Sequence, residues 1–296
     1  MQVATVTTAD FGLLHAVRDT LRDADDAYLC VAFAHERGVR LLEKELEALR
    51  VRKARVRMLV TTAFDRGGST GEALALARQL GVDVRVHNHA GGTFHPKLYL
   101  GASGREAGAV IGSANLTAGL ACNVEVGVAL RGKRVDAPIA TAWHWGEQLW
   151  QDTRSEAWLP QAAEQGSETI APDLLAALSA AQRLDPVFMT LGPRPKPNRV
   201  VEVTPTEVFI ETEETRRKRS GPQPVPAWML NIAWDYLRTR GELRNVVLLD
   251  ELRVHRSSAV CAMLARVPGV EVVKGQGIVL RWTVGVGEAR RERGRS

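Results

Sequence analysis

The chain has 296 residues, 45% of them hydrophobic, and a formal net charge of +5. It is long enough to bury a full apolar core, which excludes a small disulfide-held scaffold. Its apolar runs fall short of the roughly 18–20 residues of a membrane helix, and its start lacks the pattern of a signal peptide. Three distant cysteines without a CxxC pair indicate neither disulfides nor a cysteine zinc site. We therefore expect a cytoplasmic protein.

Positive charge is concentrated towards the C-terminus. Residues 201–296 hold 16 Lys and Arg against 12 Asp and Glu, whereas residues 1–200 hold 23 against 22. A basic part joined to a nearly neutral one suggests a polyanionic partner, such as nucleic acid, for the basic part.

Residues 1–158 read as an α/β domain. Amphipathic patterns predict helices, and short apolar runs predict strands. The predicted helices are 10–26, 35–50, 72–80 and 138–151, and the predicted strands are 27–34, 56–63, 82–86, 95–101, 108–112 and 124–130. Helices separate the first strands, which favours parallel pairing, whereas little helix separates the last three. We expect a mixed sheet flanked by helices, with site residues at strand ends.

The second half of the chain changes character. A helix is predicted over 171–184, but prolines and the basic run 216–219 make the rest of 159–225 an extended linker or exposed loop. Residues 226–284 form a separate unit with three predicted helices and a terminal hairpin, and the basic tail 285–296 is expected to be disordered.

The order of elements in 226–284 resembles a winged helix-turn-helix domain. That fold places the start of its third helix in the DNA major groove and its wing on the flanking backbone. The resemblance therefore implies six candidate DNA-binding residues: His255, Arg256, Ser257, Ser258, Lys274 and Gln276. A helical hairpin used for dimerisation is the alternative.

Five polar residues follow one another at consecutive strand ends, and they form the candidate catalytic set: His95, Lys97, Ser113, Asn115 and Glu125. Alternate residues of a strand share a face, so His95 and Lys97 should project side by side. Imidazole can act as nucleophile or acid on a phosphodiester, while ammonium and amide donors neutralise the nonbridging oxygens. Taken singly, each residue has an ordinary structural reading. We see no metal-ligand set in the sequence. The pair His87 and His89 is more typical of an exposed loop than of a metal site.

The patterns His95-x-Lys97, Gly112-Ser113-x-Asn115 and Asn123-x-Glu125 resemble the HxK/GSxN motif of the phospholipase D superfamily, especially its bacterial nuclease and restriction-endonuclease branch. The resemblance covers about residues 10–155 and implies a phospholipase D-like fold that needs no metal or cofactor. It also implies a covalent phosphohistidine on His95, with Lys97 and Asn115 on the phosphoryl oxygens and Ser113 assisting.

The chain departs from the family pattern in two ways. Ala102 stands where the family's best-known form has an aspartate, so the resemblance implies that Glu125 takes the acidic role by accepting a hydrogen bond from His95. The motif occurs once, whereas the superfamily uses two copies, which implies a homodimer with one shared site.

We therefore expect a metal-independent DNA nuclease in restriction or phage defence, working with partner proteins of such a system. The main alternative is a regulatory DNA-binding protein that uses the fold only to dimerise. A lipid or other small phosphodiesterase is a third possibility, separable by a liposome hydrolysis assay.

Overall fold

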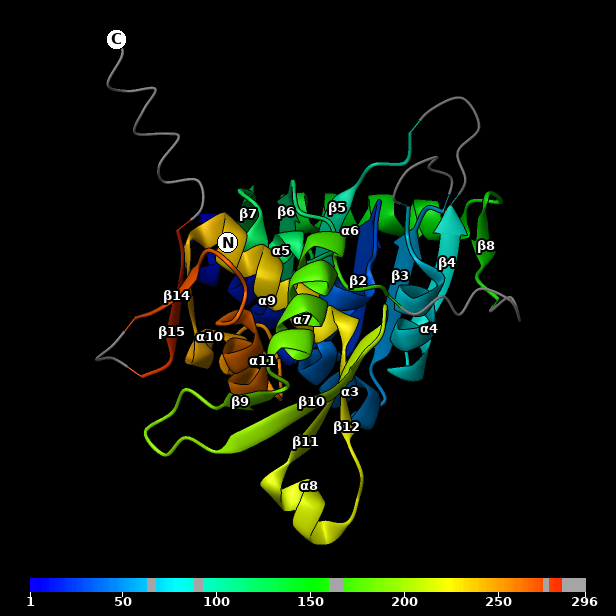
Figure 1. The fold of residues 1–296 in the computed structure, drawn as a ribbon. Helices are drawn as coiled ribbons and strands as arrows, with labels where there is room; N and C mark the ends of the chain where they lie inside the picture. Colours follow the sequence, from blue (N-terminus) through cyan, green and yellow to red (C-terminus); the bar gives the residue numbers. More distant parts are fainter. Residues whose placement is uncertain (63–67, 88–92, 160–167, 274–276, 284–296) are drawn as a thin grey trace. The chain divides into compact units, whose positions relative to one another are not determined.

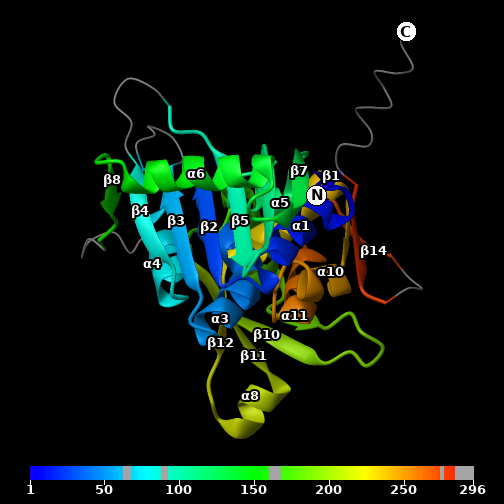
Figure 2. The same ribbon diagram turned by 180° about the vertical axis from the view of Figure 1, so that it is seen from behind.

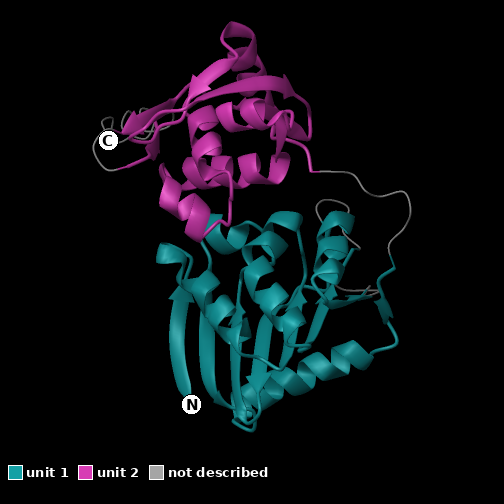
Figure 3. Cartoon of the chain, turned by 90° about the horizontal axis from the view of Figure 1, so that it is seen from below, with its two compact units in different colours: residues 1–166 teal, residues 167–296 magenta. Residues whose placement is uncertain are grey.

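The computed structural model divides the chain into two compact units, residues 1–166 and residues 167–296 (Figure 3). The structure describes residues 1–62, 68–87, 93–159, 168–273 and 277–283. None of the helices in these ranges is long and apolar enough to cross a membrane.

Unit 1 is built on an eight-stranded sheet with the strand order β1-β7-β6-β5-β2-β3-β4-β8 (Figure 1). Its strands are β1 (Gln2–Thr7), β2 (Asp26–Val31), β3 (Arg55–Val60), β4 (Asp83–His87), β5 (Lys97–Ser103), β6 (Glu106–Gly112), β7 (Val126–Lys133) and β8 (Ser155–Ala157). Strands β2, β3 and β4 are parallel, and every other neighbouring pair is antiparallel. The predicted mixed α/β sheet flanked by helices is therefore confirmed.

Helices cover both faces of this sheet. They are α1 (Gly12–Arg22), α2 (Glu36–Leu41), α3 (Glu43–Val51), α4 (Gly71–Gln79), α5 (Gly119–Cys122) and α6 (Ala137–Gln151), and a short 3-10 turn, η1 (Ala9–Phe11), precedes α1. Helix α6 crosses one face, as Figure 2 shows, and the other five lie on the opposite face. The single helix predicted over 35–50 is divided at Leu42 into α2 and α3.

Alternation along β5 separates the core from the site. Leu98, Leu100 and Ala102 belong to the apolar cluster beneath α6, where they pack with Trp143. Lys97 therefore points to the opposite face, because successive side chains of a strand alternate. Ala102 is 3% exposed within this cluster, so the position is part of the apolar core.

Two edge strands of the sheet carry little sequence signal. Strand β1 is almost wholly exposed and pairs with β7, so no buried face marks it by alternation. Strand β8 has only three residues, which pair with β4.

The first half of unit 2 differs from the predicted linker over 159–225. It contains helices α7 (Pro172–Leu184) and α8 (Glu213–Lys218), and strands β9 (Val187–Met189), β10 (Pro197–Val203), β11 (Glu207–Thr212) and β12 (Gln223–Pro226). The strands form one antiparallel sheet in the order β12-β11-β10-β9. Pro197 begins β10, and Pro224 and Pro226 lie in the edge strand β12, positions where a sheet tolerates proline.

The basic run 216–219, predicted as an exposed loop, lies at the end of α8. Thr212 and Thr215 form a capping box that starts this helix. Arg216 pairs with Glu211, and Lys218 pairs with Glu214 one helical turn back. Local capping therefore orders a segment whose charge suggested a loop.

The second half of unit 2 contains three helices and a small sheet. The helices are α9 (Ala227–Arg240), α10 (Asn245–Asp250) and α11 (Ser257–Leu264), and the strands are β13 (Glu242–Arg244), β14 (Val270–Val273) and β15 (Val279–Trp282), paired in the order β13-β15-β14. The three predicted helices correspond to α9, α10 and α11, and the predicted terminal hairpin corresponds to β14 and β15. Lys274, Gln276 and the tail 285–296 lie outside the described residues.

Arg57 on β3 carries the main buried charge of unit 1. Its side chain is 1% exposed and forms ion pairs with Asp26 at 3.1 Å and with Glu147 of α6 at 2.7 Å. Its guanidinium lies 5.1 Å from the ring centre of Tyr28. Removing one partner of such a pair leaves the other charge poorly solvated.

We predict that Arg57→Ala lowers the free energy of unfolding by about 3 kcal/mol, measured by urea denaturation. The control is Arg50→Ala, because Arg50 forms a 2.6 Å pair with Glu47 at the exposed surface. That variant should be destabilised much less, because exposed ion pairs contribute little to stability. Equal losses for the two variants would contradict this account of β3 and α6.

Candidate active site

Strand topology gathers the candidate catalytic residues of unit 1 at one edge of the sheet. Leu98 pairs with Ile111 and Gly112 pairs with Gly127, so the start of β5, the end of β6 and the start of β7 meet there. The end of β2 lies at the same edge, because Val31 pairs with Lys97. Figure 1 shows these strand ends along the upper edge of the sheet.

His95 and Lys97 are in direct contact. The Lys97 ammonium is 3.0 Å from the backbone oxygen of His95, to which it donates a hydrogen bond, and Lys97 is 9% exposed. The imidazole of His95 is exposed and meets the ring of Phe33 edge-on at 6.0 Å. Pro96 joins this segment to β2 by accepting a hydrogen bond from the Ala32 backbone at 2.9 Å. The segment therefore presents an accessible ring on an anchored backbone.

The surroundings shift the titration of both groups. Desolvation, and then the charge of Lys97, lower the pKa of His95 from its ordinary value of 6.5. Desolvation also lowers the pKa of Lys97, although the nearby carboxylate of Glu125 opposes that shift. The lowered pKa favours the neutral form of the His95 imidazole, which has a nitrogen lone pair available for attack.

Asn115 is held against the end of β2. Its Oδ1 accepts a hydrogen bond from the Phe33 backbone at 3.2 Å, and its Nδ2 makes no hydrogen bond within the described ranges. Leu116 exchanges two backbone hydrogen bonds with this strand end, to Phe33 at 3.0 Å and from His35 at 2.9 Å. A fixed oxygen orients the amide and leaves its NH2 group as a donor.

Gly38 of α2 lets this segment approach closely. A Cβ at Gly38 would lie 2.1 Å from the backbone oxygen of Leu116, which leaves no room for any other residue without movement. The helix therefore presses directly on the segment that carries Asn115.

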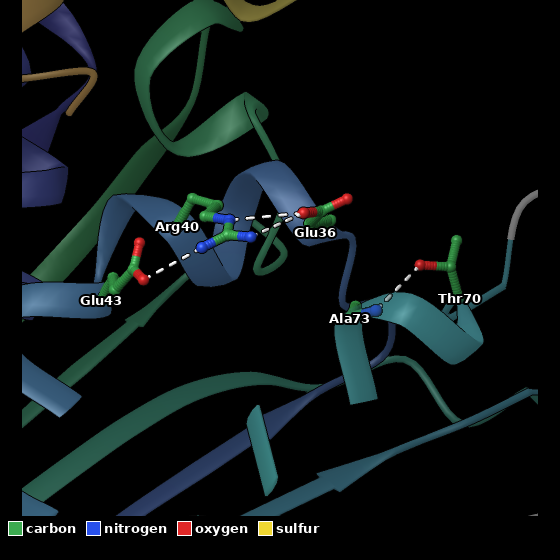
Figure 4. A network of polar contacts seen from close by, with 5 residues as sticks. All are labelled: Glu36, Arg40, Glu43, Thr70 and Ala73. Atoms are coloured by element: carbon green, nitrogen blue, oxygen red, sulfur yellow. Dashed lines mark hydrogen bonds and ion pairs between the residues drawn. The ribbon is translucent and has the colours of Figure 1, made fainter. Parts of the chain in front are cut away.

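The start of α2 is itself held by two neighbouring networks, which Figure 4 shows. Arg40 bridges Glu36 and Glu43, each at 3.0 Å. Thr70 caps α4 by accepting a hydrogen bond from the Ala73 backbone at 3.3 Å. The backbone of Thr70 also donates to the Ala34 oxygen at 3.1 Å. These contacts fix the strand end to which Asn115 is bound.

Glu125 lies among short-range partners at the start of β7. Its Oε2 accepts a hydrogen bond from the Ser113 hydroxyl, and its Oε1 accepts one from Asn123 Nδ2 at 3.2 Å. The described residues show no hydrogen bond between Glu125 and His95, which differs from the arrangement expected from the sequence. Both carboxylate oxygens are instead used by the neighbouring turns, and the charge of Glu125 acts on Lys97.

Two supporting residues carried no usable sequence signal. The Thr8 hydroxyl donates to the Asn123 oxygen at 2.7 Å and accepts from the Glu125 backbone at 3.1 Å. Tyr99 is 2% exposed and donates to the Ala114 oxygen at 3.0 Å. Burial, and then the charge of Glu125, raise the pKa of Tyr99, so its phenol stays a donor.

His87 has a structural environment rather than the exposed one expected of an HxH pair. It is 2% exposed, its Nδ1 lies 2.8 Å from the Ser155 hydroxyl, and its ring packs 4.9 Å from that of Phe94. His89 lies outside the described residues. Within the described ranges, no three His, Cys, Asp or Glu residues are grouped as metal ligands would be.

Four of the six candidate DNA-binding residues, those of the described part of unit 2, lie together at the start of α11. His255 and Ser258 are exposed, whereas Ser257 is only 5% exposed. Arg256 donates to the Gln223 side chain of β12 at 3.3 Å. This helix end therefore borders the β9–β12 sheet, which the sequence did not predict.

No family model and no curated protein matches the chain. Among solved structures, the chain is similar to a phospholipase D family member, Nuc from Salmonella typhimurium, with 14% identity, a TM-score of 0.43, and coverage of 53% of this chain and 97% of that one. NucT from Helicobacter pylori has 11% identity and a TM-score of 0.40, over 53% of this chain and all of that one (100%). Phosphatidylserine synthase from Haemophilus influenzae has 12% identity and a TM-score of 0.38, over 53% and 40%. Similarities at this level give no evidence about the activity of the chain.

We predict that His95 titrates below its ordinary pKa of 6.5 in the folded protein, measured by NMR of the imidazole. Lys97→Gln should raise this pKa, because it removes a positive charge that disfavours the imidazolium. Lys133→Gln, at the exposed far end of β7, should leave it unchanged. A pKa that does not respond to Lys97→Gln would contradict the electrostatic coupling.

Proposed function

We propose that the chain is a metal-independent phosphodiesterase that cleaves DNA, with His95 as its nucleophile. The observation that supports it most is the exposed imidazole of His95 beside two donors, the ammonium of Lys97 and the NH2 group of Asn115. These are the groups needed to attack a phosphodiester and to stabilise the charge that develops on its oxygens. The HxK/GSxN resemblance assigns the same roles to the same residues.

The proposed reaction has two steps. One His95, in its neutral form, attacks phosphorus, so that a P–N bond forms while the P–O bond to the leaving strand breaks, and a second His95, in its protonated form, gives its proton to the departing oxygen. That second imidazole then takes a proton from water, which attacks phosphorus and breaks the P–N bond. Lys97 and Asn115 hold the nonbridging oxygens, with Ser113 assisting. Glu125 positions Ser113 through their hydrogen bond and balances the charge of Lys97.

The second His95 comes from a second copy of the chain, because the motif occurs once. A patch of four exposed apolar side chains, Ile111, Val124, Val126 and Val128, lies on the strand ends beside Ser113 and Glu125. Val124 is 92% exposed, which is unfavourable for an apolar residue in water. We propose that this patch packs against its own copy across a two-fold axis, which would bring the two sites together.

DNA is the proposed substrate because unit 2 supplies elements suited to it. Helices α9 to α11 and the β14–β15 hairpin follow the order of a winged helix-turn-helix domain, with His255 and Ser258 exposed at the start of α11. Cys30, Cys122 and Cys261 are buried thiols, which agrees with the cytoplasm as the proposed compartment. We propose a role in restriction or phage defence, together with partner proteins.

A regulatory DNA-binding protein without turnover is the second candidate. Two observations favour it: Ala102 occupies the position of the family's aspartate, and Glu125 is engaged by Ser113 and Asn123. In that case unit 1 would serve only to dimerise. A cleavage assay separates the two candidates.

We predict that the purified chain cleaves DNA in excess EDTA, measured by gel electrophoresis of plasmid and oligonucleotide substrates. His95→Ala should lower the rate by at least about 10²–10⁴-fold, because it removes the attacking group. His144→Ala, which changes an exposed histidine on α6, should retain the full rate.

The same assay tests the shared site. Val126→Lys places a charge in the apolar patch and should weaken dimerisation, measured by analytical ultracentrifugation, with a parallel loss of cleavage. Absence of cleavage on every DNA substrate, with DNA binding intact, would favour the regulatory candidate. Full activity in a monomeric variant would contradict the two-histidine mechanism.

A further inference from the structure

Unit 2 contains a cavity that the proposed reaction does not use. Its volume is about 690 Å³, and it lies between the first turn of α11, the β9–β12 sheet and α8. Pockets of roughly 300–1,000 Å³ are typical of small-molecule sites. The volume alone does not identify a ligand, but the side chains that line the cavity indicate its chemical class.

Two buried polar side chains border this cavity without a hydrogen-bond partner. Asn198 of β10 is 4% exposed and Ser257 of α11 is 5% exposed, and neither side chain makes a hydrogen bond within the described part of the chain. The polar atoms of these two largely buried residues are therefore available to a molecule that enters the cavity. A bound molecule with hydrogen-bonding groups would satisfy both residues.

The charges around the cavity favour an anion. Lys196, Arg217 and Arg256 contribute positive charge, and His255 lies beside them. Helix α11 adds its own partial positive charge, since its first turn has no side-chain cap. The acidic lining residues are Glu213 and Glu214, and Glu214 is already paired with Lys218 at 2.7 Å. A phosphate group matches this distribution.

The remaining walls suit a planar ring with polar edges. Ile210 and Ala259 offer apolar surface, while the amide of Asn198 offers one donor and one acceptor in a plane. Paired donor and acceptor groups of this kind recognise the edge of a nucleobase. The walls therefore combine a phosphate region with a base region.

We propose that this cavity binds a nucleoside 5′-monophosphate unit, with its phosphate at the first turn of α11 near Arg217 and Arg256 and its base against Asn198. The unit could be supplied as a free nucleotide or as a nucleotide turned out of a DNA strand, and both present the same chemistry. This is a second site, separate from His95, and its binding does not depend on cleavage.

Isothermal titration of the full chain tests the proposal, with the four deoxynucleoside 5′-monophosphates as probes. At least one should bind, and the same nucleoside without phosphate, or inorganic phosphate alone, should bind at least 10-fold more weakly. Asn198→Asp and Arg217→Gln should each weaken binding at least 10-fold. Arg216→Gln is the matched control on the same helix, because Arg216 pairs with Glu211 and does not line the cavity.

The outcomes are distinct from those of the cleavage assay. His95→Ala should bind the nucleotide as the wild type does, so failure of the proposed nuclease would leave this result intact. Circular dichroism melting checks that both cavity variants are folded. No binding of any monophosphate, unchanged binding in both variants, or equal affinity for inorganic phosphate would overturn the proposal.

A further experiment with DNA distinguishes a free nucleotide from a nucleotide turned out of a DNA strand as the ligand. An oligonucleotide carrying 2-aminopurine should gain fluorescence on binding if a base leaves the stack, and the free monophosphate should compete with it. Binding of the monophosphate without competition would support the free nucleotide as the ligand instead.

Discussion

The register of β5 against β6 and β7 is the constraint on which the candidate active site depends. Pairing of Leu98 with Ile111 and of Gly112 with Gly127 brings the ends of three strands to one edge. Because side chains alternate along a strand, a slip of one residue in β5 would turn Lys97 into the apolar core beneath α6. The aliphatic residues of that core therefore keep the polar groups on the other face. Packing and chemistry are set by the same pairing.

Within this frame, Lys97 links the other groups of the site. It donates to the His95 backbone, and after desolvation its charge is the second cause that lowers the pKa of the His95 imidazole. The carboxylate of Glu125 in turn opposes the lowering of the Lys97 pKa by desolvation. A weakly exposed ammonium is less stabilised by water, so its charge acts strongly on its neighbours. This arrangement favours a neutral nucleophile beside donors for a phosphate. Ser113 and Glu125 complete it from the neighbouring strand ends.

The sequence predicted much of unit 1 because long apolar runs and amphipathic helices carry strong periodicity. Alternation also placed His95, Ser113 and Glu125 at strand ends. The direction of the Glu125 carboxylate was not predictable. The Thr8 hydroxyl holds the backbone of Asn123 and of Glu125, from which it is separated by 115 and 117 positions in the sequence. The carboxylate itself accepts from the Asn123 side chain. In unit 2, strands β10 and β12 were not predicted as part of a sheet, because proline at a strand start or in an edge strand resembles the composition of a linker.

A covalent bond between His95 and phosphorus can be detected by mass spectrometry of protein that is denatured during turnover at neutral or alkaline pH. Phosphohistidine is acid-labile, so an acid-treated sample taken in parallel is the control. We expect a DNA adduct on the peptide containing His95, lost on acid treatment and missing in His95→Ala. Cleavage at full rate with no adduct at His95, under a quench that preserves phosphohistidine, would contradict it.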